Sequence, residues 1–212
     1  MRGISAVNRS VAFIGLVALG ATAASAVAGV LDPIGPFVGD ASEDFESFTL
    51  GAGPSIDIFF NETVVGEPLG SVAPVFVTSG SSFLGSTISA HTGLRFAHTT
   101  SPVEFTFFEP IRQFGGYVAT NSGSDGGTVE FFDADDELIG TMPLDVTFTI
   151  PSAAYTWNGW SSSVPFTRVR ITGNGVLEGF LGYDDMQLSF VPGAPCVGLL
   201  VVAAIGRRRR RR

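Results

Sequence analysis

Thr128-Val-Glu-Phe-Phe-Asp-Ala-Asp-Asp-Glu-Leu-Ile-Gly-Thr-Met142 is the stretch that decides the fold. It contains two runs of strand-forming residues, and the acidic segment from Asp133 to Glu137 separates them. Aspartate side chains stabilise tight turns because they accept hydrogen bonds from backbone amides a short distance further along the chain. The stretch therefore predicts an antiparallel β-hairpin.

The same pattern extends through the rest of the chain between residues 29 and 190. Short β-favouring runs alternate there with clusters of glycine, proline, serine and aspartate, and no stretch shows helical periodicity over the length of a helix. This pattern predicts an all-β fold, a single antiparallel β-sandwich of the jelly-roll type. The expected strands are Phe45–Leu50, Ile56–Phe60, Pro74–Thr78, Leu94–Ala97, Val103–Phe108, Phe114–Ala119, Thr128–Phe132, Leu138–Met142, Val146–Ile150, Thr167–Ile171 and Asp185–Val191.

The N-terminus has the composition of an export signal. Arg2 and Arg9 lie in its charged start, Val11–Ala21 is apolar, and Ala24-Ser25-Ala26 or Ala26-Val27-Ala28 offers small residues for cleavage. These parts, in this order, are typical of a removable secretory signal peptide. Residues 1–28 are therefore predicted to form a signal helix that is not part of the sandwich.

The C-terminus combines a proline-containing segment, a short apolar stretch over residues 196–206 and a basic run. This order of parts resembles the sorting domain of PEP-CTERM proteins, a class of exported bacterial proteins. The resemblance implies that residues 191–212 form a short hydrophobic helix, which holds the protein in the inner membrane until an exosortase-like enzyme processes it. A plain C-terminal anchor is the alternative. The expected sorting signal consists of Pro192, Pro195, Arg207, Arg208, Arg209, Arg210, Arg211 and Arg212.

The segment between the two ends is strongly acidic. All 20 acidic residues of the chain lie between Asp32 and Asp185, together with 4 arginines and no lysine, so this segment carries a net charge of −16. Such a surface repels phosphate backbones, and nucleic acid is therefore not expected as a partner. The single cysteine, Cys196, lies in the C-terminal tail, so a disulfide within the body is excluded.

The second half of the body carries a further resemblance. The segments Phe114–Ala119, Thr128–Gly140, Trp160–Ile171 and Gly179–Leu188 look like the β-sandwich body common in PEP-CTERM proteins. Those bodies are similar to jelly rolls of the galactose-binding or carbohydrate-binding-module type. The resemblance implies an extracellular β-sandwich, and it leaves the ligand open because such folds bind many unrelated ligands.

Acidic residues near the two ends of the body form a candidate metal site. Glu46 lies in the first expected strand, and Asp184 and Asp185 open the last one. The first and last strands of a jelly roll are commonly neighbours, so these carboxylates are candidates for holding a structural Ca²⁺ ion. The alternative is that they are solvated turn residues and strand-end caps. The Asp133–Asp136 turn lacks the glycine and the distal glutamate of an EF-hand, and it is interpreted as a turn only.

Tyr155, Trp157 and Trp160 differ from the other aromatic residues because they surround the polar segment Thr-Trp-Asn-Gly-Trp-Ser. Most phenylalanines occupy alternating positions of expected strands and therefore belong in the core. Loop aromatics beside asparagine and serine can stack on sugar rings, which makes these three residues candidate binding residues. The alternative is that one of the indoles closes the end of the sandwich.

Motifs of enzyme active sites are absent from the sequence. His91 and His98 occur without a His-Glu-x-x-His pattern, no serine lies in Gly-x-Ser-x-Gly, and the absence of lysine excludes a Gly-x-x-x-x-Gly-Lys phosphate loop. The sequence thus predicts a non-catalytic, exported protein of the cell envelope that binds extracellular polysaccharide. A structural or matrix surface protein without a specific small ligand is the alternative.

Overall fold

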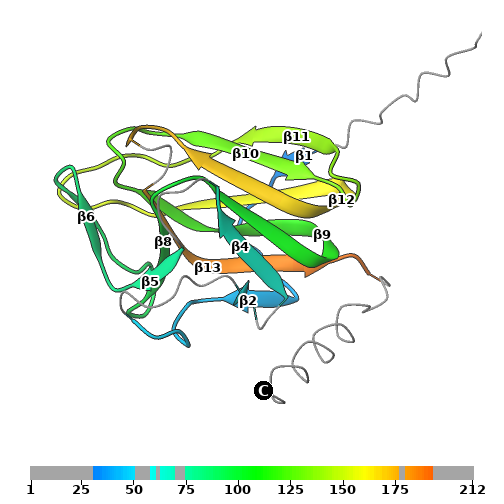
Figure 1. Ribbon diagram of the computed structural model, residues 1–212, viewed down its shortest axis with the longest axis horizontal. Coiled ribbons are helices and arrows are strands. Elements are labelled where there is room, and N and C mark those ends of the chain that lie inside the picture. Colours follow the sequence, from blue (N-terminus) through cyan, green and yellow to red (C-terminus); the bar gives the residue numbers. More distant parts are fainter. Residues whose placement is uncertain (1–30, 51–57, 61–62, 70–74, 177–179, 193–212) are drawn as a thin grey trace, which may run out of the picture.

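The computed structural model describes residues 31–50, 58–60, 63–69, 75–176 and 180–192, and these residues form an antiparallel all-β structure (Figure 1). In this part of the chain there is no α-helix, and accordingly none that could cross a membrane. The predicted signal peptide and residues 193–212 of the predicted sorting tail lie outside the described residues. The strands are β1 (Leu31–Pro33), β2 (Ala41–Glu43), β3 (Ile58–Phe59), β4 (Val64–Pro68), β5 (Phe76–Thr78), β6 (Ser81–Phe83), β7 (Ser86–Ile88), β8 (Phe96–Thr99), β9 (Val103–Thr120), β10 (Gly127–Phe132), β11 (Leu138–Pro143), β12 (Thr156–Gly173) and β13 (Leu181–Phe190).

The predicted hairpin is confirmed as β10 and β11, with Val129 opposite Met142. Its turn is stabilised as the sequence indicates, because Oδ1 of Asp133 accepts hydrogen bonds from the backbone N–H groups of Asp135 and Glu137, each at 2.9 Å. The hairpin continues a larger sheet, since β10 also pairs with β12.

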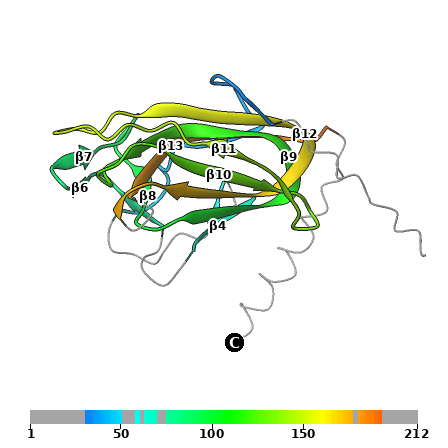
Figure 2. The same cartoon turned by 90° about the horizontal axis from the view of Figure 1, so that it is seen from above.

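The two longest strands, β9 and β12, pair with each other and form the frame of the fold. Their register shifts between Ser161 and Phe166, close to Pro110 and Pro165. Proline cannot donate a backbone hydrogen bond, and interruptions of this kind allow paired strands to bend. Figure 2 shows both strands curving from one layer of the molecule into the other at the same end.

The bent strands divide the molecule into two layers. The first layer contains β1, the first half of β12, the second half of β9, and then β13, β8 and β5, while β2 also pairs with β13. The second layer contains β11, β10, the second half of β12, the first half of β9, and then β4 and β3. The fold is therefore an antiparallel β-sandwich in which the two layers share two strands.

Aromatic rings from the two layers meet in the core between them. Phe105 of the second layer lies edge-on to Tyr183 of the first, with ring centroids 5.8 Å apart, and Phe131 packs against Trp160 at 5.7 Å. All four side chains are at most 3% exposed. Truncating such a ring to alanine typically costs ~3–5 kcal/mol, so these contacts are a main source of stability.

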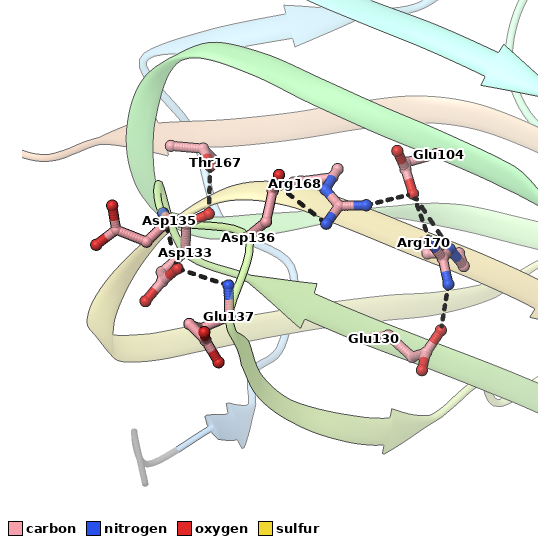
Figure 3. Close-up of polar contacts among 9 residues, drawn as sticks. All are labelled: Glu104, Glu130, Asp133, Asp135, Asp136, Glu137, Thr167, Arg168 and Arg170. Atoms are coloured by element: carbon pink, nitrogen blue, oxygen red, sulfur yellow. Dashed lines mark hydrogen bonds and ion pairs between the residues drawn. The ribbon is translucent and has the colours of Figure 1, made fainter. Parts of the chain in front are cut away.

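The outer side of the second layer carries a cluster of charged residues, which we call the ionic ladder: Glu104, Glu130, Asp136, Arg168 and Arg170 (Figure 3). Oε2 of Glu104 accepts hydrogen bonds from Arg168 at 2.8 Å and from Arg170 at 3.0 Å. Arg170 also reaches Glu130 at 3.4 Å, and Arg168 reaches Asp136 at 3.1 Å. Positive and negative charges therefore alternate across β9, β12 and β10.

Two expected strands are not formed. Within Phe45–Leu50, Phe45 has a φ of 59° and donates its N–H to the Glu43 carboxylate at 3.0 Å, so the chain turns instead of extending. Within Val146–Ile150, the N–H of Phe148 donates to Oδ1 of Asp125 at 2.6 Å. In both places side-chain acceptors take backbone N–H groups that a neighbouring strand would otherwise bind.

Candidate functional site

A row of side chains crosses the outer side of the first layer, away from the core. Trp157 of β12 lies directly opposite Tyr117 of β9, and Tyr117 lies opposite Asp184 of β13. Directly opposed residues of antiparallel strands point to the same side of the sheet. The neighbouring Val118 points into the core, so this row points outward.

We call this surface the aromatic face and define it by Tyr155, Trp157, Tyr117 and His91 with Asp184 and Asp185. Tyr155 lies two residues before Trp157 and so on the same side of the chain, and His91 comes from the loop between β7 and β8. The polar segment that the sequence suggests as a loop is therefore the beginning of strand β12.

Two glycines shape the sheet beneath Trp157. Gly159 of β12 pairs with Gly115 of β9, and a Cβ atom on Gly159 would lie 2.6 Å from the indole Nε1. A Cβ on Gly115 would lie 2.9 Å from Cζ2 of the same ring. The indole thus lies over a spot where only glycine leaves room. Its N–H donates to the backbone oxygen of Ile34 at 2.9 Å, which fixes the ring in place.

His91 connects the aromatic rings with the acidic residues. Its imidazole stacks on the ring of Tyr117, with centroids 3.7 Å apart and an angle of 16°, and Tyr155 lies edge-on to it at 5.5 Å. Its Nδ1 is 2.7 Å from Oδ2 of Asp185. Tyr117 in turn lies edge-on to Trp157 at 5.3 Å. The rings therefore form one continuous set of contacts.

Asp184 is the buried anchor of the aromatic face. It is 0% exposed, and Oδ2 accepts the backbone N–H groups of His91 at 2.8 Å and Thr92 at 3.2 Å. Burial raises the pKa of Asp184 to about 6; the hydrogen bond from Thr92 opposes this shift, and the negative charge of Asp185 adds to it. Asp184 holds the loop that carries His91 against the sheet.

Asp185 is the accessible acid of the pair, with 24% of its side chain exposed. It has a φ of 47°, and the pairing of β13 with β9 shifts register directly after Asp184. Its carboxylate accepts a hydrogen bond from the hydroxyl of Thr92 at 2.9 Å in addition to the contact with His91. The irregular backbone at this point turns the side chain toward the loop and the solvent.

Glu46 lies beside the same loop and completes its attachment. Its Oε1 accepts the backbone N–H groups of Leu94 at 2.6 Å and Arg95 at 2.7 Å. Gly93 has a φ of +62°, and a Cβ there would lie 2.3 Å from Oε1 of Glu46. The three acids predicted to bind a metal are therefore brought near one loop, over residues 91–95, and each of them bonds to it.

These three carboxylates do not fit a calcium site as arranged. Calcium takes 6–8 oxygen ligands, whereas the two oxygens of Asp184 already accept three backbone N–H groups, from His91, Thr92 and Asp185. Across the described ranges of the chain, no group of three or more His, Cys, Asp or Glu side chains has an arrangement suited to a metal ion. The acids instead accept hydrogen bonds from the loop over residues 91–95, and Asp184 does so while fully buried and not as a solvated turn residue.

The structure separates the three predicted binding aromatics. Tyr155 and Trp157 belong to the aromatic face and are partly exposed. Trp160 is 3% exposed and packs against Phe131 in the core, because it lies three positions after Trp157 in the strand and therefore points to the opposite side. Its predicted role in stacking on a ligand is therefore corrected to a role in packing.

Sequence reasoning missed Tyr117 and His91. The signal for Tyr117 was the Gly115-Gly116 pair before it, because adjacent glycines in a strand indicate a close approach by another group. For His91 there was no such signal, because no sequence pattern connects it with Asp185. Of the predicted sorting signal, Pro192 is exposed at the end of the described chain, while Pro195 and the six arginines lie outside the described residues.

Comparison with solved structures finds several carbohydrate-active proteins at low similarity. A family 6 carbohydrate-binding module has a TM-score of 0.28 and 15% identity, over 46% of this chain and 75% of that chain. A glycoside hydrolase family 43 arabinoxylan arabinofuranohydrolase from Bacillus subtilis has a TM-score of 0.36 and 16% identity, over 56% of this chain and 25% of that chain. An isomalto-dextranase from Arthrobacter globiformis has a TM-score of 0.31 and 14% identity, over 76% of this chain and 32% of that chain.

The matched region spans a quarter of the length of the arabinofuranohydrolase, and at these TM-scores the similarities assign neither a ligand nor an activity to this chain. No protein-family model and no curated protein sequence matches the chain.

Proposed function

We propose that this protein is a non-catalytic binding protein for extracellular polysaccharide and that the aromatic face is its binding surface. The observation that carries the proposal is the cross-strand row of Trp157, Tyr117 and Asp184, extended by His91 and Tyr155. The row is built on regular strands and held by packing, so its geometry is set before a ligand arrives.

The aromatic face combines the two kinds of group that a sugar requires. A sugar ring presents C–H groups on its flat sides, which pack against aromatic rings, and hydroxyl groups at its rim, which need hydrogen-bond partners. Trp157 and Tyr117 supply the rings, and both are partly exposed. Asp185 and His91, at 24% and 30% side-chain exposure, supply polar atoms beside them.

The acidic residues of this surface support its shape and have no catalytic role in the proposal. Asp184 is fully buried and is bonded to backbone N–H groups, and the carboxylate of Asp185 orients His91. These contacts hold the loop over residues 91–95 in place, which is what a binding surface needs.

The proposal also includes the setting that the sequence indicates. The protein is exported by the signal peptide over residues 1–28 and reaches the cell envelope, where residues 191–212 associate with the inner membrane and an exosortase-like enzyme processes them. The net charge of −16 between Asp32 and Asp185, from 20 acidic residues and 4 arginines, favours solubility outside the cell.

A glycan array probed with the full-length protein and with Trp157→Ala tests the proposal. We expect the protein to retain a defined set of polysaccharides and Trp157→Ala to weaken that binding by about tenfold or more, because truncating a central aromatic anchor typically costs more than ~1 kcal/mol of binding free energy.

Phe108→Ala is the matched control, since Phe108 is an exposed aromatic (45%) that lies outside the aromatic face. It should leave the binding profile unchanged. Absence of binding to every glycan, or equal binding by the protein and Trp157→Ala, would contradict the proposal and favour the structural or matrix role.

A further inference from the structure

The aromatic face is negatively charged where a ligand would lie. Asp184 and Asp185 are adjacent, and both face the loop that carries His91. The arginines of the described chain are engaged elsewhere. Arg168 and Arg170 belong to the ionic ladder, Arg112 donates to the backbone oxygen of Ser163, and Arg95 donates to the backbone oxygens of Glu46 and Phe48.

Tyr155 lies in the same negative environment. Its hydroxyl oxygen is buried and has no hydrogen-bond partner within the described residues. Burial raises the pKa of Tyr155 far above its usual value, and the negative charges of Asp184 and Asp185 raise the pKa further. Both acids therefore act on the space next to the Tyr155, His91 and Tyr117 rings.

Asp185 is able to accept a further hydrogen bond. Each oxygen of its carboxylate has two lone pairs, and each accepts one bond, from His91 to Oδ2 and from Thr92 to Oδ1. Its side chain is 24% exposed, so the carboxylate is open to a donor from a ligand.

We propose that the sugar recognised by the aromatic face is cationic, a 2-amino-hexose unit whose amine is free and not acetylated. This inference rests on the proposed function. The ammonium group would donate to Asp185, while the sugar ring packs on Trp157 and Tyr117.

Two physical terms favour an ammonium group over a neutral substituent at this place. A hydrogen bond between an ammonium and a carboxylate is charge-assisted and about twice as strong as a neutral one. A cation within ~6 Å of a tyrosine or tryptophan ring is also attracted by the negative face of that ring. The same negative charges repel uronic-acid and sulfated polysaccharides, so the proposed surface discriminates between cationic and anionic polysaccharides.

Isothermal titration with two hexamers of the same backbone tests the inference. The β-1,4-linked hexamer of glucosamine carries free amines, and the hexamer of N-acetylglucosamine is neutral. At a pH where the amines are protonated, we expect the full-length protein to bind the glucosamine hexamer about tenfold more tightly, as the two terms above imply. Asp185→Asn should abolish this preference, so that the variant binds the two hexamers with affinities within about twofold of each other.

Asp135→Asn is the matched control, because it removes the same charge from an exposed position on the β10–β11 turn, where Asp133 binds the backbone N–H of residue 135. The preference should survive this change. If Asp135→Asn weakens the preference as much as Asp185→Asn, the total charge of the protein and not the aromatic face would explain it, and the inference would be wrong.

The remaining outcomes separate the inference from the proposed function. Equal binding of both hexamers, lost in Trp157→Ala and in Tyr117→Leu, would retain the glycan-binding role and reject the cationic sugar. No binding of either hexamer or of any arrayed glycan would reject both. If polylysine bound as tightly as the glucosamine hexamer, the proposed specificity for a sugar would be rejected, because any ammonium-bearing polymer would then satisfy the site. Thermal melting of each variant confirms that it is folded.

Discussion

The aromatic face and the ionic ladder are built on the same two strands, β9 and β12, yet their side chains are used in opposite ways. On the ionic ladder, Glu104 lies between two arginines, and Arg168 also covers the ring of Phe132, with its guanidinium carbon 4.0 Å from the centroid. The charged groups of the ionic ladder are therefore paired with one another.

On the aromatic face, rings lie beside acids that no arginine neutralises among the described contacts. Asp184 is held by backbone N–H groups, Asp185 is paired with His91, and Trp157 and Tyr117 remain partly exposed. The difference indicates that the ladder serves stability, whereas the aromatic face keeps partly exposed rings and polar atoms that a ligand can contact. Changes on one face should therefore affect stability and changes on the other should affect binding.

The largest expected effect is on stability and comes from Glu104→Gln. The substitution removes the negative charge that Arg168 and Arg170 share. The side chains of Glu104 and Arg168 are only 15% and 17% exposed, so solvent screens this pair poorly. We expect the free energy of unfolding, measured with urea, to fall by about 2–3 kcal/mol, while glycan binding changes by less than about twofold.

Glu109→Gln removes the same charge from a half-buried position outside the ladder and should be nearly neutral. If Glu104→Gln reduced glycan binding as strongly as Trp157→Ala does, the two faces would not be independent.

Gly159→Ala is expected to have an intermediate effect and to act mainly on binding. The new Cβ would lie 2.6 Å from Nε1 of Trp157 and 2.9 Å from the oxygen of Ile34, so the indole must move. We expect a loss of about 1–2 kcal/mol in stability from overpacking and a fall of about tenfold in glycan affinity from the displaced ring.

Gly35→Ala is the control, because a Cβ on Gly35 meets no atom within 4 Å. A Gly159→Ala protein with full affinity would show that the position of the indole does not matter for binding.

The smallest effect concerns pH and the buried Asp184. Its folded pKa of about 6 lies above the ordinary value of 3.8, so the folded state binds the proton more tightly than the unfolded state. The resulting contribution to stability is fully present below pH ~4 and is lost as the pH rises through ~6. Asp184→Asn has no titrating group at this position, so its stability lacks this pH-dependent contribution.

We therefore expect wild-type protein to lose about 1–2 kcal/mol of stability relative to Asp184→Asn between pH ~4 and ~7, as measured by urea unfolding at each pH. A difference between the two proteins that stays constant over this range would show that Asp184 is not held in an unfavourable environment for its charge.

Much of the fold follows from the sequence because it depends on local patterns. The Asp133 turn and the alternation of buried residues along Val103, Phe105 and Phe107 were sufficient to predict the hairpin and the sandwich. The expected strand at residues 45–50 failed because a side chain, that of Glu43, takes the N–H of Phe45. The hydrophobic periodicity of a sequence carries no information about hydrogen bonds between side chains and the backbone.

The candidate site was only partly predictable, for a related reason. The polar segment around Trp157 has the composition of a loop, and only the pairing of Gly159 with Gly115 reveals it as a strand that supports an indole. The contact between His91 and Asp185 joins residues 94 positions apart, so it depends on the completed sheet. The predicted ligand contact of Trp160 is wrong because the segment is a strand, in which Trp157 and Trp160 point to opposite sides.

The bend at Pro110 and Pro165 has a consequence for how the molecule can come apart. Because β9 and β12 run through both layers, the layers are joined by continuous strands at the bend, and the connections from β8 to β9 and from β9 to β10 join them again at the opposite end. Trp157 and Tyr117 lie on the strand halves that extend away from the bend. A polysaccharide spanning these residues would fasten two neighbouring strands of the first layer to each other, so occupied protein should resist mechanical and proteolytic opening of that layer better than free protein.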